Sequence, residues 1–587
     1  MGKCIGLRNK RGVTLLALVI TIIVLLILAG ITISAITGEN GIIRNAGQAK
    51  EETEISEEKE IVEKATVQAM GNNKYGNIEE KELQEQLNKE AGEGKTDVTD
   101  IEDAFEVVFM KSNRYYTVDK EGNIEGAYEI INDKNPGDIT TGKDGEKLDG
   151  TEEKPYQIWC IEDLVEWSQN YGKYTSSYIK LCTTLNFKSK LSYADSERTD
   201  FGDINGDTND GNTLMNEMTT GTGFKPIRAF YGTFDSEFEN QYHEIKNIYI
   251  NQEESAGLII AGNSSTVIKN ISISGEIRST DTAAGIICGN YETKGITIIN
   301  CKNYATIRGN IMVGGICAWA IRDSNRIQDC ENYGNIYIES VDYPYGGAGG
   351  ILAYGGGSIE DCYNAGEIYG NYRCGGIVGT GNEMEIKNCA NTGTVHSMGN
   401  YASGGILGKQ SGEAITIINC MNAATIGEES TGNAGGIVGE YIGVSYTTDR
   451  ILNIYNCYNI GNIVSQNYCG GILGRQGLVS LSIQLNIENC YSAGEIAGKY
   501  AGGVVGKLTN SDSRTTVTSS IKCTYYLTTS ANRAIYEGNC TEEEEIEGYD
   551  RTFIKSQDFC NILNNHIGEN EGWKHWILEE EKYPTFE

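Results

Sequence analysis

The stretch Ile327-Gln328-Asp329-Cys330-Glu331-Asn332-Tyr333-Gly334-Asn335-Ile336 is one copy of a phrase that recurs through the C-terminal part of the chain. The phrase reads Ile-x-x-Cys-x-Asn-x-Gly-x-Ile, and its cysteine recurs at Cys301, Cys330, Cys362, Cys389, Cys420, Cys457, Cys490 and Cys523. The successive spacings of 29, 32, 27, 31, 37, 33 and 33 residues are too irregular for a heptad and too regular for chance. They predict a solenoid of stacked coils.

Alternation within the phrase predicts short strands. Cys330, Asn332, Gly334 and Ile336 lie two residues apart, so on a strand they share one face. After a polar insert of variable length comes a glycine pair, at Gly314-Gly315, Gly349-Gly350, Gly375-Gly376, Gly404-Gly405, Gly435-Gly436, Gly470-Gly471 and Gly502-Gly503, with a degenerate first copy at Ala284-Gly285. The short apolar Gly-Gly-Ile segments suit buried strands, and the inserts suit loops along one edge, where repeat proteins tend to carry binding specificity.

A bend is expected just before each cysteine. Ile327 lies three residues before Cys330, so both face inward only if the chain bends between them. Asn or Asp stands directly before seven of the eight cysteines, at Asn300, Asp329, Asp361, Asn388, Asn419, Asn456 and Asn489. These side chains bond to nearby backbone and favour turns, so we expect them to form the bend.

The Gly-Gly-Ile-Val-Gly copies resemble GLUG-motif repeats, which form parallel β-solenoids in bacterial surface adhesins and beside the protease unit of immunoglobulin A peptidases. The resemblance implies a mainly β chain with a parallel β-solenoid (β-helix). Its leading coils would occupy residues 156–270, its GLUG-type repeats residues 271–523 and its C-terminal cap residues 524–587, in which residues 573–584 would cover the edge of the last coil. The motif implies an architecture and no known chemistry.

A charge-free segment, residues 13–38, lies near the N-terminus. Its almost wholly apolar part reaches about 36 Å as a helix at ~1.5 Å per residue, enough to cross a bilayer core of ~30 Å. A secretory signal would have a shorter apolar stretch and a small-x-small cleavage site. Basic residues precede the segment and glutamates follow it, so the positive-inside rule predicts a cytoplasmic leader, residues 1–12. We therefore expect a single-pass cell-membrane protein with the bulk of the chain on the cell surface.

The junction Arg11-Gly12-Val13-Thr14-Leu15 resembles the cleavage site of type IV prepilins and pseudopilins. The resemblance implies a prepilin peptidase as partner, cleavage after Gly12 and methylation of the new N-terminal residue, Val13. The family usually begins with Phe and has Glu at the fifth mature position, where this chain has Ala17. That Glu pairs with a neighbouring subunit during filament assembly, so its absence favours a lone membrane helix over a filament subunit.

Residues 39–131 have the element order of a pilin head. Apolar residues at helical spacing within the Glu- and Lys-rich stretch 51–70 predict the exposed continuation of one long helix. A second short helix is expected around Leu83, and residues 104–118 predict a hairpin-like sheet. Residues 132–155 are rich in Gly, Asp, Lys and Thr without an apolar pattern, which predicts a solvated linker.

Composition limits the partners. A net charge of −33 argues against nucleic acid as a partner. Seventeen cysteines in an exported chain would suggest disulfides, and loss of Cys4 with the leader would leave sixteen. Coils stack ~4.8 Å apart, whereas disulfide Cβ atoms lie about 3.8 Å apart, so we favour a reduced ladder of buried thiols. For six cysteines outside this ladder both the reduced and the disulfide state stay open: Cys160, Cys182, Cys374, Cys469, Cys540 and Cys560. One thiol per coil makes no tetrahedral cage, so we expect no metal and no cofactor.

Catalytic motifs are not found in the sequence. The four histidines, His243, His396, His566 and His575, do not form the His-Glu-x-x-His pattern of zinc proteases. A β-solenoid can hydrolyse polysaccharides with paired carboxylates, but the repeat acids Glu331, Glu360 and Glu488 occupy positions typical of a solvated surface. Residues 203–211 alternate oxygen ligands as a calcium loop does, but Thr208 and Leu214 replace the required Gly and Glu, which favours a polar turn.

Tyr363, Tyr458 and Tyr491 directly follow their cysteines and should face outward. They form either a stripe that binds carbohydrate or peptide, or an aromatic ladder that only stiffens the wall. We therefore expect a non-enzymatic, membrane-anchored cell-surface protein that displays a β-solenoid for adhesion or for binding a glycan or protein ligand. One alternative is a minor pilin or pseudopilin that carries the solenoid at the tip of a type IV pilus or secretion filament, with other pilin subunits as partners. Another is a carbohydrate-active β-helix enzyme.

Overall fold

The structure, a computed structural model, describes residues 42–587 apart from 73–77, 102–103, 113, 130–135, 144, 190–191, 194–213, 322–323, 341–345, 400, 443–448, 478–481, 512–514, 569 and 571. The expected leader and membrane segment lie outside these residues. Within them, no helix is long and apolar enough to span a bilayer. The chain divides into two compact units, Met1–Ile130 and Ile131–Glu587.

The N-terminal unit packs two helices on an antiparallel sheet. Its helices are α2 (Ile42–Asn72) and α3 (Glu80–Glu90), and its strands, in the order β1-β2-β3-β4, are β1 (Thr96–Ile101), β2 (Ala104–Phe109), β3 (Arg114–Asp119) and β4 (Ile124–Glu129). Val62, Ala65 and Ala69 form the buried stripe of α2, against Leu83 and Leu87 of α3. The long helix, the short helix and the central hairpin predicted here are confirmed, and the structure adds an outer strand on each side.

A buried ion pair fixes α2 to the sheet. Arg114 Nε of β3 donates to Glu58 Oε2 at 2.9 Å, and the Tyr116 hydroxyl donates to the same oxygen at 3.0 Å. Burial and then the Glu58 charge raise the pKa of Tyr116, so its hydroxyl stays protonated and remains a donor. Two residues of one strand thus donate to both oxygens of the carboxylate, which makes its burial tolerable.

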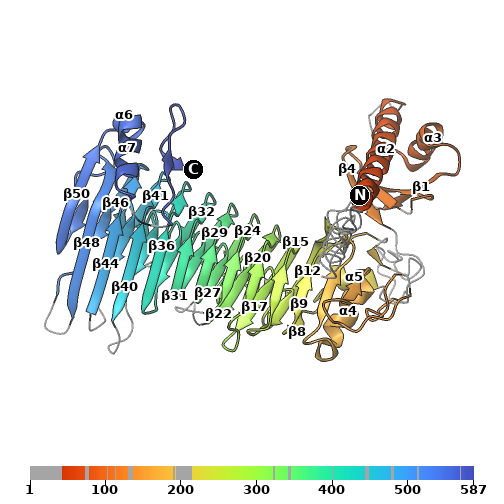
Figure 1. The fold of residues 1–587 in the computed structure, drawn as a ribbon, viewed down its shortest axis with the longest axis horizontal. Coiled ribbons are helices and arrows are strands. Elements are labelled where there is room, and N and C mark those ends of the chain that lie inside the picture. The colour runs from red at the N-terminus through yellow and green to blue at the C-terminus, as the bar shows by residue number, and fades with distance from the viewer. Residues whose placement is uncertain are drawn as a thin grey trace, which may run out of the picture. The chain divides into compact units, whose positions relative to one another are not determined.

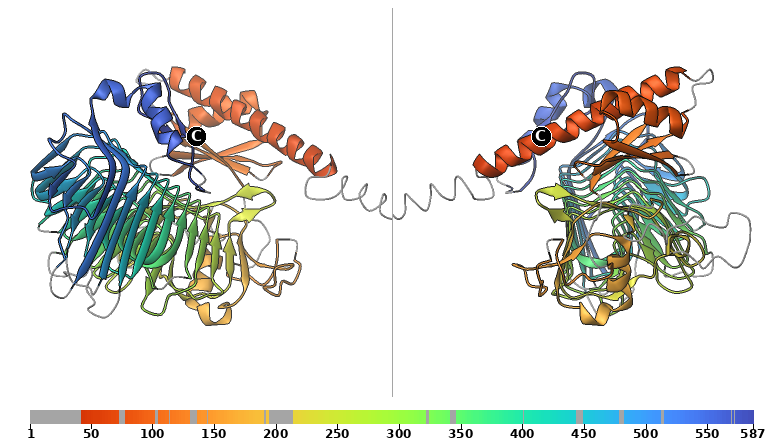
Figure 2. Two further views of the ribbon diagram at one scale, coloured as in Figure 1. Left: turned by 60° about the vertical axis from the view of Figure 1, so that its left-hand side comes forward. Right: turned by 90° about the vertical axis from the view of Figure 1, so that its right-hand side faces the viewer.

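The second unit is a parallel β-solenoid, as the repeat predicts (Figures 1 and 2). Each coil contributes short strands that pair in register with the coils before and after it. The first column, before the bend, contains β14 (Val267–Lys269), β18 (Thr297–Ile299), β23 (Arg326–Gln328), β36 (Ala414–Ile418), β40 (Arg450–Tyr455), β44 (Ser482–Glu488) and β48 (Thr516–Leu527). The second, after the bend, contains β19 (Lys302–Asn303), β24 (Glu331–Asn332), β28 (Tyr363–Asn364), β32 (Ala390–Asn391), β37 (Met421–Asn422), β41 (Tyr458–Asn459) and β45 (Tyr491–Ser492).

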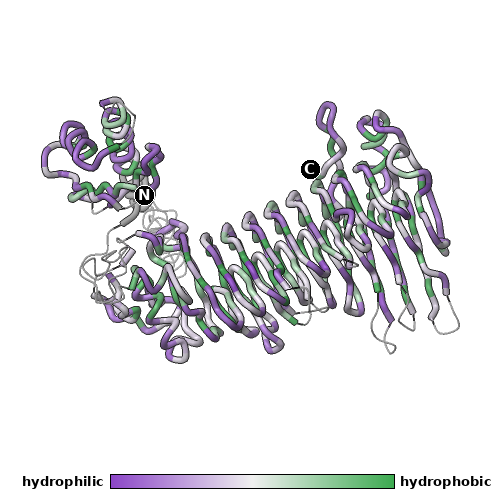
Figure 3. The backbone as a smooth tube through the Cα atoms, turned by 180° about the vertical axis from the view of Figure 1, so that it is seen from behind, coloured by the Kyte–Doolittle hydropathy of each residue, from purple (hydrophilic) through white to green (hydrophobic). Residues whose placement is uncertain are grey.

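Three further columns close each coil. The third contains β15 (Ser272–Ser279), β20 (Thr306–Gly309), β25 (Ile336–Ile338), β29 (Ile368–Gly370) and β33 (Val395–Ser397). The fourth, which ends in the first glycine of each pair, contains β16 (Ala283–Ala284), β21 (Met312–Gly314), β26 (Gly347–Gly349), β30 (Arg373–Gly375), β34 (Ala402–Gly404), β38 (Asn433–Gly435), β42 (Ile463–Gly470) and β46 (Ile496–Gly502). The fifth contains β13 (Ile259–Ala261), β17 (Ile287–Asn290), β22 (Cys317–Ala320), β35 (Leu407–Gln410), β39 (Val438–Tyr441), β43 (Leu473–Gln476), β47 (Val505–Lys507) and β49 (Ile535–Glu537), and the long strands β27 (Leu352–Glu360) and β31 (Val378–Lys387) join it to the first. Hydrophobic and hydrophilic residues alternate along the coils (Figure 3).

Irregular coils open the solenoid. They contain β5 (Tyr156–Ile158), α4 (Ile161–Gln169), the 3-10 turn Tyr171–Lys173, β6 (Tyr178–Leu181), β7 (Leu185–Asn186), α5 (Leu214–Thr219), β8 (Ile227–Ala229), β9 (Thr233–Asp235), β10 (Glu237–Phe238), β11 (Gln241–Tyr242) and β12 (Glu244–Gln252). Their core is aromatic: Trp167 packs edge-on against Phe230 and Phe234, with ring centroids 5.0 and 4.9 Å apart. The prediction of a solvated linker is wrong at Ile139. Ile139 is fully buried in this core, and its carbonyl accepts from the backbone N of Gln157 at 3.1 Å.

A ladder of buried asparagine amides runs inside the second column. It joins Asn303, Asn332, Asn364, Asn391, Asn422 and Asn459, and each Nδ2 donates to the Oδ1 of the next coil at 2.7–2.8 Å before the ladder ends on Ser492. The second amide hydrogen of each side chain bonds to the carbonyl two residues on, as in Asn332 to Gly334 at 2.9 Å. Both amide hydrogens are therefore satisfied in the dry interior, which is what makes burial of this polar group favourable. We call this set the inner ladder.

Two glycines of each repeat leave room for the inner ladder: one in the phrase, such as Gly334, and the second of the glycine pair, such as Gly315. A Cβ at Gly315 would lie 2.5 Å from Asn332 Oδ1 and 2.0 Å from the carbonyl oxygen of Gly350. A Cβ at Gly334 would lie 2.0 Å from the carbonyl oxygen of Ala305. Both positions need glycine because of close approach between coils.

The thiols form a second buried ladder beside the amides. Cys301, Cys330, Cys362, Cys389, Cys420, Cys457 and Cys490 are all buried and free. Each thiol donates to the carbonyl of the residue two positions earlier, as in Cys330 to Gln328 at 3.2 Å. The other described cysteines, including Cys374 and Cys469, are also free. Cys523 departs from the expected register: because Tyr491 pairs with Tyr525, the position of Cys490 is taken by Thr524, and Cys523 lies opposite Asn489.

The expected bend is confirmed. Asn300, Asp329, Asp361, Asn388, Asn419, Asn456 and Asn489 all have positive φ, between 51° and 55°. Asn and Asp tolerate this left-handed conformation better than other residues with a Cβ. Their side chains point outward and form a second amide ladder, with Asn388 donating to Asp361 at 3.0 Å, Asn419 to Asn388 at 2.9 Å and Asn456 to Asn419 at 2.8 Å. We call these seven residues the bend ladder.

The C-terminal segment does not cover the edge of the last coil. That edge is β50 (Glu542–Tyr549), whose exposed glutamates are typical of charges that discourage further pairing. The segment instead folds back over the outer face beside the bend, with α6 (Arg551–Ile554), α7 (Gln557–Asn565), β51 (Trp576–Ile577) and β52 (Thr585–Phe586). Its aromatic side chains pack on the tyrosines of that face, which offer more apolar surface than the charged edge.

Replacement of one inner-ladder residue tests how much these amides stabilise the solenoid. Asn422→Ala leaves one amide hydrogen of Asn391 without its acceptor, and it removes the side-chain donor to Asn459 Oδ1 and to the carbonyl of Ala424, so we expect a loss of about 2–4 kcal/mol in unfolding free energy. Chemical denaturation and hydrogen exchange around β37 would measure it. The exposed Asn462→Ala, which removes one acceptor for Glu495 N, is the matched control and should cost less than about 1 kcal/mol. Equal losses would contradict a stabilising role for the ladder.

Candidate functional site

The outer face beside the bend gathers most of the predicted site residues. It carries the bend ladder and the outward side chains of β19, β24, β28, β32, β37, β41 and β45, and we call it the bend wall. Tyr363 is half-buried on this wall. Tyr458 and Tyr491 also point away from the solenoid core, but they are 2% and 0% exposed because the C-terminal segment covers them. The expectation that these two tyrosines present a free ligand surface is therefore wrong.

Aromatic packing holds the C-terminal segment on the wall. The rings of Tyr458 and Tyr491 stack with centroids 5.3 Å apart, and Trp576 lies against both at 5.6 Å. The Tyr491 hydroxyl donates to the carbonyl of Pro584, and the Tyr458 hydroxyl bonds to Thr585 Oγ1 at 2.7 Å. Burial raises the pKa of both tyrosines, so the hydroxyls remain protonated. The covered tyrosines thus stabilise the fold.

The bend ladder forms hydrogen bonds with residues 572–577, which we call the strap. Asn419 Nδ2 donates to the Gly572 carbonyl at 2.8 Å, and Lys574 N donates to Asn419 Oδ1 at 3.0 Å. One coil further, Asn456 Nδ2 donates to the Lys574 carbonyl at 3.0 Å, and Trp576 Nε1 donates to Asn456 Oδ1 at 2.9 Å. Each of these two amides therefore forms hydrogen bonds with a neighbouring residue of the bend ladder and with the strap at the same time.

The wall is open over the earlier coils. Tyr304 and Tyr333 are 46% and 40% exposed and stack with centroids 4.9 Å apart at an interplanar angle of 4°. Tyr363 meets Tyr333 edge-on at 5.9 Å. Tyr304 and Tyr333 were missed by the sequence reasoning, which followed the residue directly after each cysteine. They lie three residues after their cysteines, and only the third position of each phrase would have revealed them.

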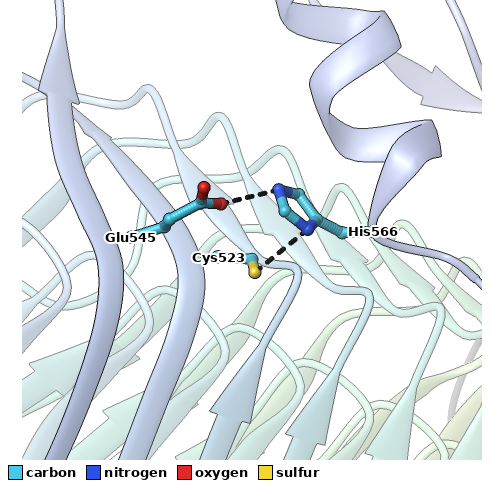
Figure 4. A group of neighbouring side chains, drawn as sticks. All are labelled: Cys523, Glu545 and His566. Carbon is cyan, nitrogen blue, oxygen red and sulfur yellow. Dashed lines mark hydrogen bonds and ion pairs between the residues drawn. The ribbon is translucent and has the colours of Figure 1, made fainter.

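In the last two coils the bend position is occupied by Cys523 and Glu545 and not by Asn or Asp. Lys522 pairs with Glu544 and Thr524 with Ile546, so Cys523 lies opposite Glu545, and both have positive φ, 47° and 51°. His566, at the end of α7, contacts both side chains (Figure 4). Its Nδ1 lies 3.2 Å from Cys523 Sγ, and its Nε2 lies 2.8 Å from Glu545 Oε2.

Cys523, Glu545 and His566 are the one group among the described residues whose atoms lie close enough together to hold a metal ion. Thiol, imidazole and carboxylate are the donors that Zn²⁺ accepts. The imidazole, however, uses one nitrogen for the thiol and the other for the carboxylate, so the two partners lie at opposite sides of the ring. This is a hydrogen-bonded chain and not a cage around one point. Burial and then the Glu545 charge raise the pKa of Cys523 to about 12, which disfavours a reactive thiolate.

A second stack of rings lies on the third column. Tyr337 and Tyr369 stack with centroids 5.1 Å apart, and His396 continues the stack at 4.6 Å. The guanidinium of Arg308 lies over Tyr337 at 4.1 Å and closes one end. Because Tyr369 and Arg308 cover the Tyr337 ring, the stack offers no free face at this residue. We interpret it as a reinforcement of the column.

Two stretches singled out in the sequence are not tested by the structure. Gly12 and Val13, at the expected cleavage site, lie outside the described residues, as do residues 203–211 of the calcium-like stretch. The repeat acids Glu331 and Glu360 instead form ion pairs, with Lys302 at 3.0 Å and Lys387 at 3.5 Å. Such surface pairs are typical of a solvated wall.

Comparison with known proteins adds no family. No family model and no curated protein sequence matches the chain. A search of solved structures gives a crystal structure of a Bacteroides ovatus protein described provisionally as an immunoglobulin A1 protease. The two chains are 15% identical over 75% of this chain and 95% of that one, with a TM-score of 0.22. A similarity at this level carries no argument about function.

Cys523→Asn tests whether the interruption of the bend ladder costs stability. Asn tolerates the positive φ at this rung, and its amide would supply a donor to Asn489 Oδ1, which is buried without a hydrogen-bond partner among the described residues. We expect unfolding free energy to rise by about 1 kcal/mol, measured by denaturation.

Cys523→Ser is the matched control, since it removes the thiol without adding an amide, and it should not stabilise. A loss of stability in Cys523→Asn as large as that in His566→Ala would instead show that the Cys–His–Glu chain itself holds α7 on the wall.

Proposed function

We propose that the chain is a non-enzymatic, membrane-anchored cell-surface protein that displays its β-solenoid for adhesion or ligand binding. The charge-free segment 13–38 with basic residues before it and glutamates after it supports anchoring with the solenoid outside. A reduced, closely packed solenoid supports a display role, because its side-chain ladders hold a long surface rigid.

The observation that carries ligand binding is the open part of the bend wall. Tyr304, Tyr333 and Tyr363 form a partly exposed aromatic group on a wall whose continuation already binds a polypeptide segment of this chain. Tyrosines are enriched in protein interfaces because they combine a large apolar area with a polar tip.

A minor pilin or pseudopilin is the second candidate function. The N-terminal unit, a long helix followed by a four-stranded antiparallel sheet, supports it. Ala17 in place of the usual Glu argues against it, because that carboxylate pairs with a neighbour in the filament. Crosslinking from the segment after Val13 to a major pilin would favour the filament role, whereas a purely monomeric membrane species would exclude it.

Processing at the leader can be tested by one substitution. Gly12→Val should block the prepilin peptidase, because that peptidase cuts after glycine, and the membrane fraction should then contain a chain longer by residues 1–12. Mass spectrometry of the N-terminal peptide would also show whether Val13 is methylated in the unaltered protein. Gly6→Val, inside the leader, is the matched control and should be processed normally. Equal chain lengths in all three proteins would contradict processing at this site.

Surface display and binding are tested together on cells and in solution. Protease added to intact cells should remove the solenoid while the membrane segment, residues 13–38, stays protected. The full chain in mild detergent, applied to an array of glycans and matrix proteins, should bind at least one class of ligand. Tyr333→Ser should weaken that binding by about tenfold or more if the tyrosine is a central contact. Tyr369→Ser, on the third column, should leave it unchanged.

A further inference from the structure

The strap shows how the bend wall recognises a polypeptide. At Asn419, one amide hydrogen goes to Asn388 and the other to the strap carbonyl of Gly572, while the oxygen accepts from Asn456 and from Lys574 N. Asn419 therefore forms two hydrogen bonds with neighbouring residues of the bend ladder and two with the strap.

Among the uncovered positions of the bend ladder, Asn300 and Asn388 have the same amide as Asn419 and Asn456 but no strap over them. Asn388 donates one hydrogen to Asp361 and accepts from Asn419, which leaves one hydrogen and one lone pair outward. Asn388 and Asn300 are half-buried, whereas Asp329 and Asp361 are exposed. The hydrogen-bonding positions that hold the strap thus continue over four earlier coils.

Charge distinguishes the open rungs from the covered ones. Where the strap binds, the rungs are neutral amides, but Asp329 and Asp361 are adjacent carboxylates on successive coils. Neither forms an ion pair with a described lysine, arginine or histidine. Burial and then the neighbouring Asp361 charge raise the pKa of Asp329, which is the mark of an uncompensated pair. A lysine or arginine laid across these rungs would relieve the repulsion.

The open tyrosines favour a peptide over a sugar. Tyr304 and Tyr333 stack with centroids 4.9 Å apart, so one face of each ring is turned toward the other ring, and the Tyr333 hydroxyl donates to Glu331 Oε2 at 2.7 Å. A sugar ring docks on an exposed aromatic face, whereas the gaps between rings and rungs suit the side chains of an extended chain. Trp573 of the strap already packs in this way, against Tyr455 with centroids 5.7 Å apart.

We propose that Asn300, Asp329, Asp361 and Asn388, together with Tyr304, Tyr333 and Tyr363, form a docking site for an extended, basic polypeptide segment of another protein. The segment lies along the bend wall as the strap does, with its backbone on the ladder amides and a lysine or arginine over the two aspartates. This proposal rests on the proposed function and specifies that the ligand is a basic polypeptide.

The test uses the full chain in mild detergent and a blocked peptide, Gly-Trp-Lys-His-Trp-Ile, which copies residues 572–577. Calorimetry should show binding that weakens as salt is added. A peptide with Glu in place of Lys should bind about threefold to tenfold more weakly, the range of one surface ion pair. Hydrogen exchange should show protection at the coils of Asp329 and Asp361.

The decisive variant is the double change Asp329→Asn and Asp361→Asn. It keeps the positive φ and the acceptor for Asn388, and so preserves the fold, while it removes both charges. The affinity for the lysine peptide should fall to that of the glutamate peptide. Tyr333→Ser should weaken binding of both peptides by about tenfold. Tyr369→Ser, on the third column, is the control and should change neither.

Three outcomes would overturn the proposal. If the double variant binds the lysine peptide as tightly as the unaltered chain does, the aspartates do not select charge. Protection only at the coils of Asn419 and Asn456 would show that the peptide exchanges with the strap. Self-association that the peptide abolishes would make a second copy the occupant. Cell-surface proteolysis tests display separately, so a chain that is displayed but binds no peptide would overturn this inference alone.

Discussion

The inner ladder is the interaction on which the solenoid depends. Six buried amides donate along the stack in one direction, and each also caps the carbonyl of its own coil. An amide fits this role because it has two donors and an acceptor in one plane, so it satisfies its own coil and the next. The second glycine of each pair follows from this ladder, since a Cβ at Gly315 would enter the space of the Asn332 amide. Strand pairing then repeats in a single register.

The bend ladder repeats the same amide chemistry on the outside, and its exposure decides what it does. Under the C-terminal segment Asn456 is fully buried and has a partner for each hydrogen. Over the earlier coils the same position is solvated and includes two carboxylates. The same position of the coil thus binds the C-terminal segment in the later coils and is accessible to solvent in the earlier coils. The tyrosines beside it follow the same division, with Tyr491 buried and Tyr333 exposed.

Much of this arrangement could be predicted from the repeat, because repetition turns a weak local pattern into a strong one. The parallel solenoid, the bend and the reduced thiols all follow from the period-two alternation of Cys330, Asn332 and Ile336 and from the odd step to Ile327. Features that occur once could not be predicted in this way. Ile139 is a single apolar residue in a polar stretch, and no period marks it as core.

The candidate site was harder to predict than the fold, since it depends on contacts between distant segments. The fold-back of residues 551–586 over the wall leaves no repeating signal, so Tyr458 and Tyr491 had the same local pattern as Tyr363 but a different exposure. Cys523 had the spacing of the thiol ladder, yet the strand register moves it to the bend and places it beside His566. Register is set by all the pairings of a coil, and a one-residue slip moves a side chain to the other face.

The regular register of the coils also bears on how such a chain can change in length. In the inner ladder each coil donates to the next coil and accepts from the previous one with the same amide, so loss or gain of one complete repeat would leave this ladder continuous. The terminal pieces are different: Ser492 ends the inner ladder, and Cys523 and Glu545 end the bend. A change in repeat number is therefore expected among the uncovered coils. It would lengthen or shorten the exposed part of the bend wall and leave the part covered by the C-terminal segment unchanged.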